Sequence, residues 1–215
     1  MPYWPALILG LILTAYWGRV LRLVYKIRKS TGRSANYRPR EKLGLVLRLI
    51  WNPAVVVWVA HPYLTAFQAR LPELLRPMAR LTHAAVAWPA TALAAAALAA
   101  TWVCWKKMGK SWRMGINPEE KTQLIVSGPY AYVRHPIYAL SSILMLTSVA
   151  IVPSPLMISA GAIHLLLLQW EARREEKYLM VNHGEPYIEY CRHVGRFVPR
   201  SVAAYRPREP VNLTA

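Results

Sequence analysis

The chain has 215 residues, of which 55% are hydrophobic and only 17% are charged. A soluble domain normally carries about 25% charged residues, so this composition argues against one. The mean hydropathy is +0.20, and nine Trp and twelve Tyr supply the aromatic load typical of two membrane interfaces. The formal net charge is +17, but the Lys and Arg residues lie between long apolar runs. The positive-inside rule accounts for that arrangement, so we expect a lipid bilayer, and no nucleic acid, as partner.

Five apolar segments are predicted to be membrane-spanning helices, for which about 20 mostly apolar residues are needed. They cover residues 2–24, 43–67, 84–105, 136–152 and 155–170. The last two are short and are joined only by Pro153 and Ser154, with Pro155 opening the second. Such a tight, proline-bounded connection predicts an antiparallel helical hairpin. The expected fold is therefore all-α, a polytopic membrane bundle of about five helices.

The basic residues of the connecting segments predict the orientation of this bundle. Residues 26–42, residues 106–134 and the segment after Trp170 are rich in Lys and Arg. All three lie on one side of the membrane if five helices span it. By the positive-inside rule that side is the cytoplasm, which places the N-terminus outside and the C-terminus inside.

Polar residues and prolines interrupt the second predicted helix. Arg48 is close enough to the start of the helix for its side chain to snorkel to the interface. Asn52 and His61 each precede a proline, which favours a kinked helix with satisfied polar groups; a substrate-binding role is the alternative. In the third helix, residues 92–100 are almost all Ala, which predicts close packing inside the bundle.

The first polar stretch with unusual detail is GPYAYVRHPIY, residues 128–138, where a polar loop enters the membrane. Gly-Pro and His-Pro restrict the backbone, and Pro136 suits the first turn of a helix. Arg134 and His135 are therefore expected at the mouth of that helix. An interfacial anchor of tyrosines and a snorkelling arginine is the alternative interpretation.

The second such stretch follows the predicted hairpin and contains EEKYL, HGEPYIEY and RFVP, within residues 175–199. At 3.6 residues per turn, Glu171, Glu175 and Tyr178 share one helix face, and Glu176 lies on the adjoining one. The alternative interpretation is an exposed helix solubilised by Glu–Arg and Glu–Lys pairs.

Together the two stretches resemble the isoprenylcysteine carboxyl methyltransferase family and its bacterial relatives. The preceding GKSWR, residues 109–113, fits the bacterial branch, and the resemblance runs over residues 109–199. It implies an integral membrane methyltransferase that uses S-adenosylmethionine, bound in a cytoplasmic pocket to which the C-terminal helical segment contributes. A bacterial inner membrane is the expected location. The expected units are transmembrane helices in 1–108, a methyltransferase core in 109–200 and a loose tail in 201–215.

The resemblance also implies the site residues. The doublet of Glu175 and Glu176 matches the family's paired glutamates, with Glu176 preferred. The predicted catalytic residues are Arg134, Glu176 and Arg196. The predicted cofactor-binding residues are Val126, Gly128, Tyr130, His135, Pro136, Tyr138, Glu175, Tyr187 and Tyr190.

The chemistry of these residue types suits S-adenosylmethionine independently of the resemblance. Arg or backbone N–H groups suit its carboxylate, a glutamate suits its ammonium or ribose hydroxyls, and tyrosines can face adenine or the sulfonium. No metal is predicted, because Cys104 and Cys191 lie far apart and the spacing of His183, Cys191 and His193 is a weak signal.

Two other functions remain open on the sequence. NADPH-dependent sterol reductases are similar in an RHP segment and a related C-terminal pocket, but they are normally larger. A non-enzymatic membrane accessory protein is the second alternative. If the chain is a methyltransferase, the acceptor is lipophilic or amphiphilic: a prenylated-cysteine carboxylate, another lipid or a small thiol. The sequence does not indicate an oligomeric state.

Overall fold

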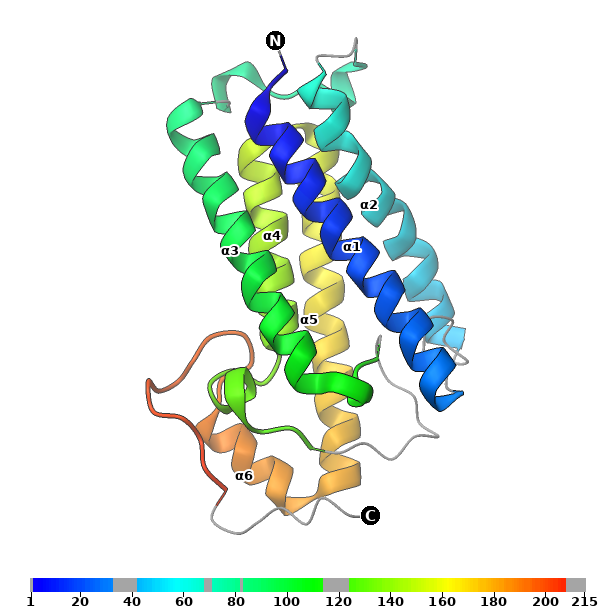
Figure 1. Ribbon diagram of the computed structural model, residues 1–215, viewed down its shortest axis with the longest axis vertical. Helices are drawn as coiled ribbons and strands as arrows, with labels where there is room; N and C mark the ends of the chain where they lie inside the picture. The colour runs from blue at the N-terminus through cyan, green and yellow to red at the C-terminus, as the bar shows by residue number, and fades with distance from the viewer. Residues whose placement is uncertain (1, 33–41, 68–70, 82, 114–123, 208–215) are drawn as a thin grey trace.

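The structure, a computed structural model, describes residues 2–32, 42–67, 71–81, 83–113 and 124–207. Within those ranges it contains helices and no strand, as the sequence predicts (Figure 1). The helices are α1 Trp4–Thr31, α2 Lys42–Ala66, α3 Ala84–Met108, α4 Pro136–Ile151, α5 Pro155–His183 and α6 Glu185–His193. Four short 3-10 turns join them: Glu73–Leu75, Ala79–Leu81, Gly109–Ser111 and Gly128–Ala131.

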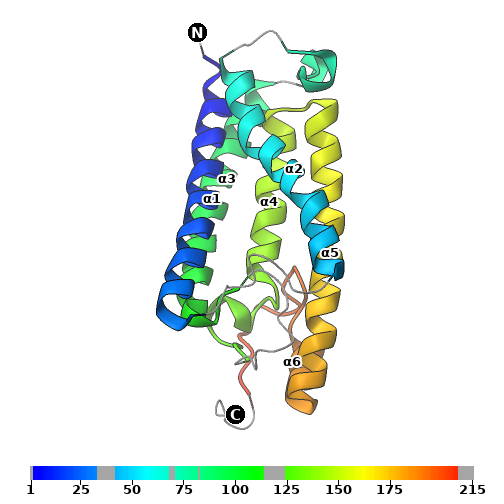
Figure 2. The ribbon, with the colours of Figure 1, turned by 90° about the vertical axis from the view of Figure 1, so that its right-hand side faces the viewer.

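The five long helices form a closed ring in the order α1, α2, α5, α4, α3, because each contacts the next and α3 contacts α1. In Figure 2, α1 and α3 lie together on the left and α5 on the right, and α2 crosses the view obliquely from α1 to α5. The aromatic and aliphatic core includes Leu9, Leu13, Trp58, Leu144 and Met157, all fully buried. The short helix α6 lies below the ring, beside the far end of α5 (Figure 1).

Three of the described helices, α1 to α3, are long and apolar enough to cross a membrane. Helix α4 is apolar but has only 16 residues, about 24 Å at 1.5 Å per residue. Helix α5 has 29 residues and continues to His183, well past the predicted end of its apolar part. Nothing in residues 171–183 breaks a helix until Gly184, whose φ of +57° suits glycine.

The predicted helical hairpin is confirmed. Helix α4 ends at Ile151 and α5 begins at Pro155, with the Ser154 side chain accepting a hydrogen bond of 3.0 Å from the Met157 N–H. The two helices approach closely at Gly161, where an added Cβ would lie 3.1 Å from a methyl of Val149. A small residue is thus required at this crossing.

The polar residues of α2 divide between structure and surface. His61 is buried, with Nε2 2.6 Å from the Leu75 carbonyl oxygen and Nδ1 3.4 Å from Ser154 Oγ, so it ties α2 to the hairpin turn. Asn52 is exposed on the outside of the bundle. His61 is thus a satisfied polar group and Asn52 a surface residue, and α2 continues as one helix through Pro53 and Pro62.

The Ala-rich helix α3 packs through one face only. Ala87, Ala90, Ala94 and Ala97 are buried at intervals of three and four residues, whereas Ala95 on the opposite face is exposed. The prediction of close packing is right for the first face, and the second face is available to lipid.

Replacing Ala94 with Leu is expected to force α3 away from its neighbours and to destabilise the bundle by about 1–3 kcal/mol, since the site has no room for the added carbons. Unfolding in mixed detergent micelles, followed by tryptophan fluorescence, measures the effect. Ala95→Leu, on the exposed face of the same helix, is the matched control and should cost much less. Equal losses for the two variants would contradict the observed packing.

Candidate functional site

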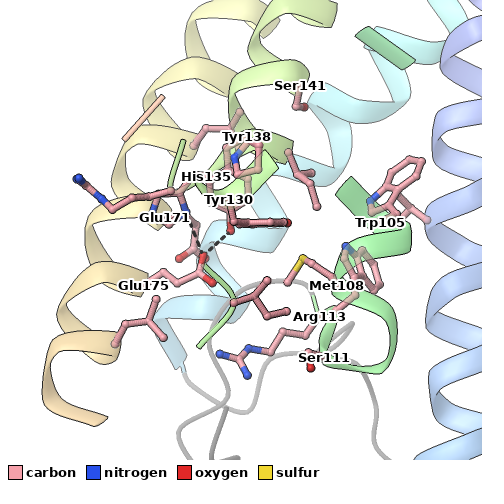
Figure 3. Close-up of a pocket in the computed structure, with 18 of the residues that line it drawn as sticks. Trp105, Met108, Ser111, Arg113, Tyr130, His135, Tyr138, Ser141, Glu171 and Glu175 are labelled. Atoms are coloured by element: carbon pink, nitrogen blue, oxygen red, sulfur yellow. Dashed lines mark hydrogen bonds and ion pairs between the residues drawn. The ribbon is translucent and has the colours of Figure 1, made fainter. Parts of the chain in front are cut away.

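A cavity opens at the end of the ring where α3, α4 and α5 meet the segments outside the bundle. In Figure 3, Trp105, Met108, Ser111 and Arg113 form one wall, and the carboxylates of α5 face them from the other. The remaining lining comes from the segment before α4, from α6 and from the inner faces of α1 and α2. The cavity therefore combines aromatic surface with acidic and basic side chains.

The structure brings most of the predicted site residues to this cavity. Those that line it are Tyr130, Arg134, His135, Pro136, Tyr138, Glu175, Tyr187 and Tyr190. Four others do not: Val126 and Gly128 lie in the segment leading to it, and Glu176 and Arg196 pack behind its wall. The two sequence stretches singled out above thus meet in one place.

The segment before α4 is shaped by its glycine and proline residues. Gly128 has φ +64°, and Pro129 starts the 3-10 turn Gly128–Ala131. The Tyr190 hydroxyl of α6 donates a hydrogen bond of 2.6 Å to the Tyr130 carbonyl oxygen, and the Tyr205 N–H donates one of 3.0 Å to that of Ala131. The loop before α4 is therefore held against α6 and the C-terminal segment.

The C-terminal segment pairs with the same loop through the backbone. The Arg134 N–H donates to the Gly195 carbonyl oxygen at 2.8 Å, and the His135 N–H donates to that of Arg196 at 3.0 Å. Gly195 is required by space, because an added Cβ would overlap the Val198 carbonyl oxygen. This pairing brings the guanidinium groups of Arg134 and Arg196 to the same side chain of α5, Glu176.

Glu176 accepts hydrogen bonds from both of these arginines. Arg134 Nε and Nη2 donate to Oε1 at 3.0 and 2.8 Å, and Arg196 Nε and Nη2 donate to Oε1 and Oε2 at 2.9 and 2.5 Å. Arg134 also donates to the carbonyl oxygens of Cys191, near the end of α6, and of Val194, just after it. We call the group of Arg134, Glu176 and Arg196 the arginine clamp.

The clamp keeps Glu176 ionised although the carboxyl is only 5% exposed. Burial alone would raise the pKa of Glu176, but the surrounding His135 and the two arginines hold that pKa well below its usual range. His135 contributes through Nε2, which lies 3.4 Å from Oε1. A buried charge of this kind is tolerable only while its partners stay in place.

Glu175, the other member of the doublet, has different surroundings. It lines the cavity, where the Tyr138 hydroxyl donates a hydrogen bond of 3.2 Å to Oε2 and His135 Nδ1 lies 3.7 Å away (Figure 3). The His135 and Tyr138 rings are stacked, 5.3 Å apart and nearly parallel. Glu175 therefore faces the cavity, and Glu176 holds the wall behind it.

Buried tyrosines supply the aromatic surface at the end of the cavity that lies away from the helix bundle. Burial raises the pKa of Tyr130, Tyr187 and Tyr190 far above the ordinary phenol value, so all three are uncharged. Tyr187 and Tyr190 contact each other with centroids 5.9 Å apart. Uncharged aromatic rings on a cavity wall suit a flat heterocycle or an onium group.

Sequence reasoning missed the cavity residues of the first helices. Arg48, expected to snorkel to the interface, lines the cavity with its Cζ 5.8 Å from the Trp51 ring centroid. Tyr16 and Trp17 line it as well. Their signal was indistinguishable from an ordinary aromatic belt at a helix end.

No group of three or more His, Cys, Asp or Glu residues that could hold a metal ion occurs among the residues the structure describes. His183, Cys191 and His193 do not form one there, and Arg200 instead contacts the Cys191 carbonyl oxygen. The site chemistry has to be read from the cavity residues themselves.

The ring of apolar helices places the chain among α-helical integral membrane proteins. Residues 90–181 match the model of the isoprenylcysteine carboxyl methyltransferase (ICMT) family, which confirms the resemblance indicated by the sequence motifs. The match covers less than half of the chain: it begins in α3 and ends in α5. It includes the loop before α4 and both members of the glutamate doublet. No curated protein matches the chain significantly.

Replacing Glu176 with Gln is expected to destabilise the folded protein by about 3–5 kcal/mol at pH 7, because Arg134 loses the carboxylate that balances its buried charge. Unfolding in mixed micelles measures this change. Glu189→Gln on α6 is the control, since the Arg192 partner of Glu189 is exposed and the pair is worth under about 1 kcal/mol.

The same two proteins give a pH test. The depressed pKa of Glu176 means that its stabilising effect is complete above the ordinary glutamate value of 4.5 and is lost as the pH falls below it. The difference between wild type and Glu176→Gln should therefore shrink below about pH 4.5. A difference that stays constant down to pH 3 would show that the charge of Glu176 is not what stabilises the fold.

Proposed function

We propose that the protein is an S-adenosylmethionine-dependent membrane methyltransferase whose cofactor binds in the cavity beside Glu175. The observation that carries the proposal is the position of the family match: residues 90–181 include both walls seen in Figure 3, from Trp105 on α3 to Glu175 on α5. The neighbouring α6 adds Tyr187 and Tyr190, which the sequence motifs also indicated.

The residues present fit such a cofactor. The Glu175 carboxylate can accept hydrogen bonds from an ammonium or from ribose hydroxyls, and it already accepts one from Tyr138. The uncharged rings of Tyr130, Tyr187 and Tyr190 can face adenine. Arg113, on the opposite wall, carries the charge that a ligand carboxylate prefers. When bound, S-adenosylmethionine would supply the methyl group on its sulfonium.

The chain's own residues would bind, orient and exclude water. Methyl transfer to a carboxylate or thiolate depends chiefly on in-line placement and desolvation, so no acid–base residue is required at the reacting atoms. We therefore assign Glu176 and Arg196 a positioning role, through the loop and backbone pairing that they hold. Arg134 belongs to the same clamp and also lines the cavity, where it can face the acceptor.

We further propose that all five long helices lie in the bilayer, with the cavity on the cytoplasmic side of a bacterial inner membrane. Helix α4 reaches across much of the bilayer, and the first part of α5 runs antiparallel beside it. The basic last turns of α1 and α3 both lie at the cavity end of the ring (Figure 1). The positive-inside rule makes that end cytoplasmic.

Isothermal titration of S-adenosylmethionine into protein in detergent or lipid tests the proposal. Wild type should bind, and Glu175→Gln should bind about tenfold or more weakly, because a neutral amide cannot replace a carboxylate opposite an ammonium. Glu185→Gln is the control, as that side chain is exposed on α6 and away from the cavity.

Two outcomes would contradict the proposal. Wild-type protein that is folded but shows no binding of S-adenosylmethionine excludes it outright. Saturable binding of NADPH in its place would favour the reductase alternative, and equal affinity in Glu175→Gln and Glu185→Gln would move the cofactor away from Glu175.

A further inference from the structure

The cavity extends beyond the segment that matches the family, into the interior of the helix ring. Its lining there includes Tyr16 and Trp17 of α1, Trp51 of α2 and Ser141 of α4. Helices α1 and α2 lie outside residues 90–181. We call this part the inner end of the cavity, to distinguish it from the part beside Glu175.

A chain of hydrogen-bonding side chains from three helices lies at the inner end. Ser141 Oγ is 3.1 Å from His164 Nε2 of α5, and Tyr16 of α1 lines the cavity together with Ser141. All three are nearly fully buried, at 5% exposure for Tyr16, 4% for Ser141 and 1% for His164. We call these three residues the polar triad.

Interhelical polar contacts often serve only to hold membrane helices together, and the bundle contains one such contact next to the triad. The Trp58 N–H of α2 donates a hydrogen bond of 2.7 Å to Ser148 Oγ, and both side chains are fully buried. That pair is closed to the cavity, because neither residue lines it. Structural packing accounts for the pair completely.

The polar triad differs from this pair in two respects. Ser141 and Tyr16 open on the cavity, and His164 Nδ1 is buried with no hydrogen-bond partner among the described residues. An unpaired polar nitrogen inside an apolar bundle is costly, and packing gives no reason for it. Because His164 does not itself line the cavity, a ligand there would meet the hydroxyls of Tyr16 and Ser141, with His164 hydrogen-bonded to Ser141 behind them.

The surroundings of the triad indicate what kind of group that is. The His164 ring lies 4.7 Å from the Trp58 centroid and 5.6 Å from the Trp51 centroid, so it is enclosed by indoles. Tyr, Ser and a neutral His can each donate and accept hydrogen bonds, but none brings a charge. These three side chains suit an uncharged polar group, and the Trp51 ring on the cavity wall suits a flat ligand ring.

We propose that the polar triad of Tyr16, Ser141 and His164 is the binding subsite for the methyl acceptor, and that it takes an uncharged hydroxyl on a flat, apolar body, as in a phenolic lipid. That the ligand is the methyl acceptor rests on the proposed function. The chemical class of the ligand rests on the triad. It adds to the function a specificity determinant supplied by α1, α4 and α5.

The test compares 4-bromophenol with 4-bromotoluene, which differ only by a hydroxyl in place of a methyl group. Both quench tryptophan fluorescence through bromine, and Trp17, Trp51 and Trp105 line the cavity as reporters. After correction for partition into detergent, wild type should bind 4-bromophenol about tenfold more tightly, the value of one or two well-made hydrogen bonds. Saturating S-adenosylmethionine should leave that preference in place.

Ser141→Ala and His164→Phe should each reduce the preference to about twofold or less, while the binding of 4-bromotoluene changes little. Ser159→Ala is the matched control, since Ser159 is exposed on α5 and hydrogen-bonds only to its own helix, at the Pro155 carbonyl oxygen. His164→Phe can disturb packing, so Ser141→Ala, a smaller change, decides the outcome if His164→Phe does not fold.

The results separate this inference from the proposed function. An equal affinity of wild type for the two probes, or a preference that survives in Ser141→Ala, overturns the triad as a hydroxyl subsite even if S-adenosylmethionine binds. Displacement of 4-bromophenol by S-adenosylmethionine places the probe in the cofactor part and also overturns it. If the phenol preference is present but S-adenosylmethionine does not bind, the subsite stands and its role for a methyl acceptor fails.

Discussion

The ionised, buried carboxylate of Glu176 is the constraint on which the rest of the site depends. It joins three segments far apart in sequence: the loop before α4 through Arg134, helix α5 itself, and the C-terminal segment through Arg196. Beside it, an apolar cluster of Leu124, Tyr187, Tyr190 and Val194, with Leu179 of α5 packed against it, joins the same region. Removing a charge from the arginine clamp leaves the others unpaired, so the clamp forms as a unit or not at all. The cavity wall that carries Glu175 keeps its position because the adjacent residue, Glu176, is bound by Arg134 and Arg196.

The cavity divides into two parts of different origin. The part beside Glu175 is built from the segment that matches the methyltransferase family together with α6, and its tyrosines and carboxylate suit a nucleoside cofactor. The inner end is built largely by α1 and α2 with Ser141 of α4, and it is enclosed by indoles. If the first part binds the methyl donor and the second the acceptor, as proposed, the acceptor can vary between relatives while the methyl donor stays the same. The proposed division between cofactor binding and acceptor binding rests on this arrangement.

The sequence predicted the helices well where a proline or a hydrophobic boundary coincides with a helix start, as at Pro136 and Pro155. It misplaced the ends of α1 and α5, because hydropathy reports where the membrane is expected to end and not where the helix ends. Helix α5 runs on to His183 through residues that are polar but still helix-forming. The motifs also located most of the cavity, since eight of the twelve predicted site residues line it: Tyr130, Arg134, His135, Pro136, Tyr138, Glu175, Tyr187 and Tyr190.

What the sequence could not give is the way in which distant segments meet. Glu175 and Glu176 lie on adjoining helix faces, and only the position of the two arginines tells which face is the wall and which is the cavity. The sequence could not predict the polar triad for the same reason, because its members are ordinary residues in three apolar helices that the closed ring brings together.

Hydrogen–deuterium exchange with and without S-adenosylmethionine tests the central claim, that one ligand site is made jointly by the loop before α4, the far end of α5 and α6. Slower exchange in residues 124–138, 171–179 and 185–193 together, with residues 4–12 unchanged, is the predicted result; protection absent from the loop before α4, or found only in α1 and α2, would contradict it.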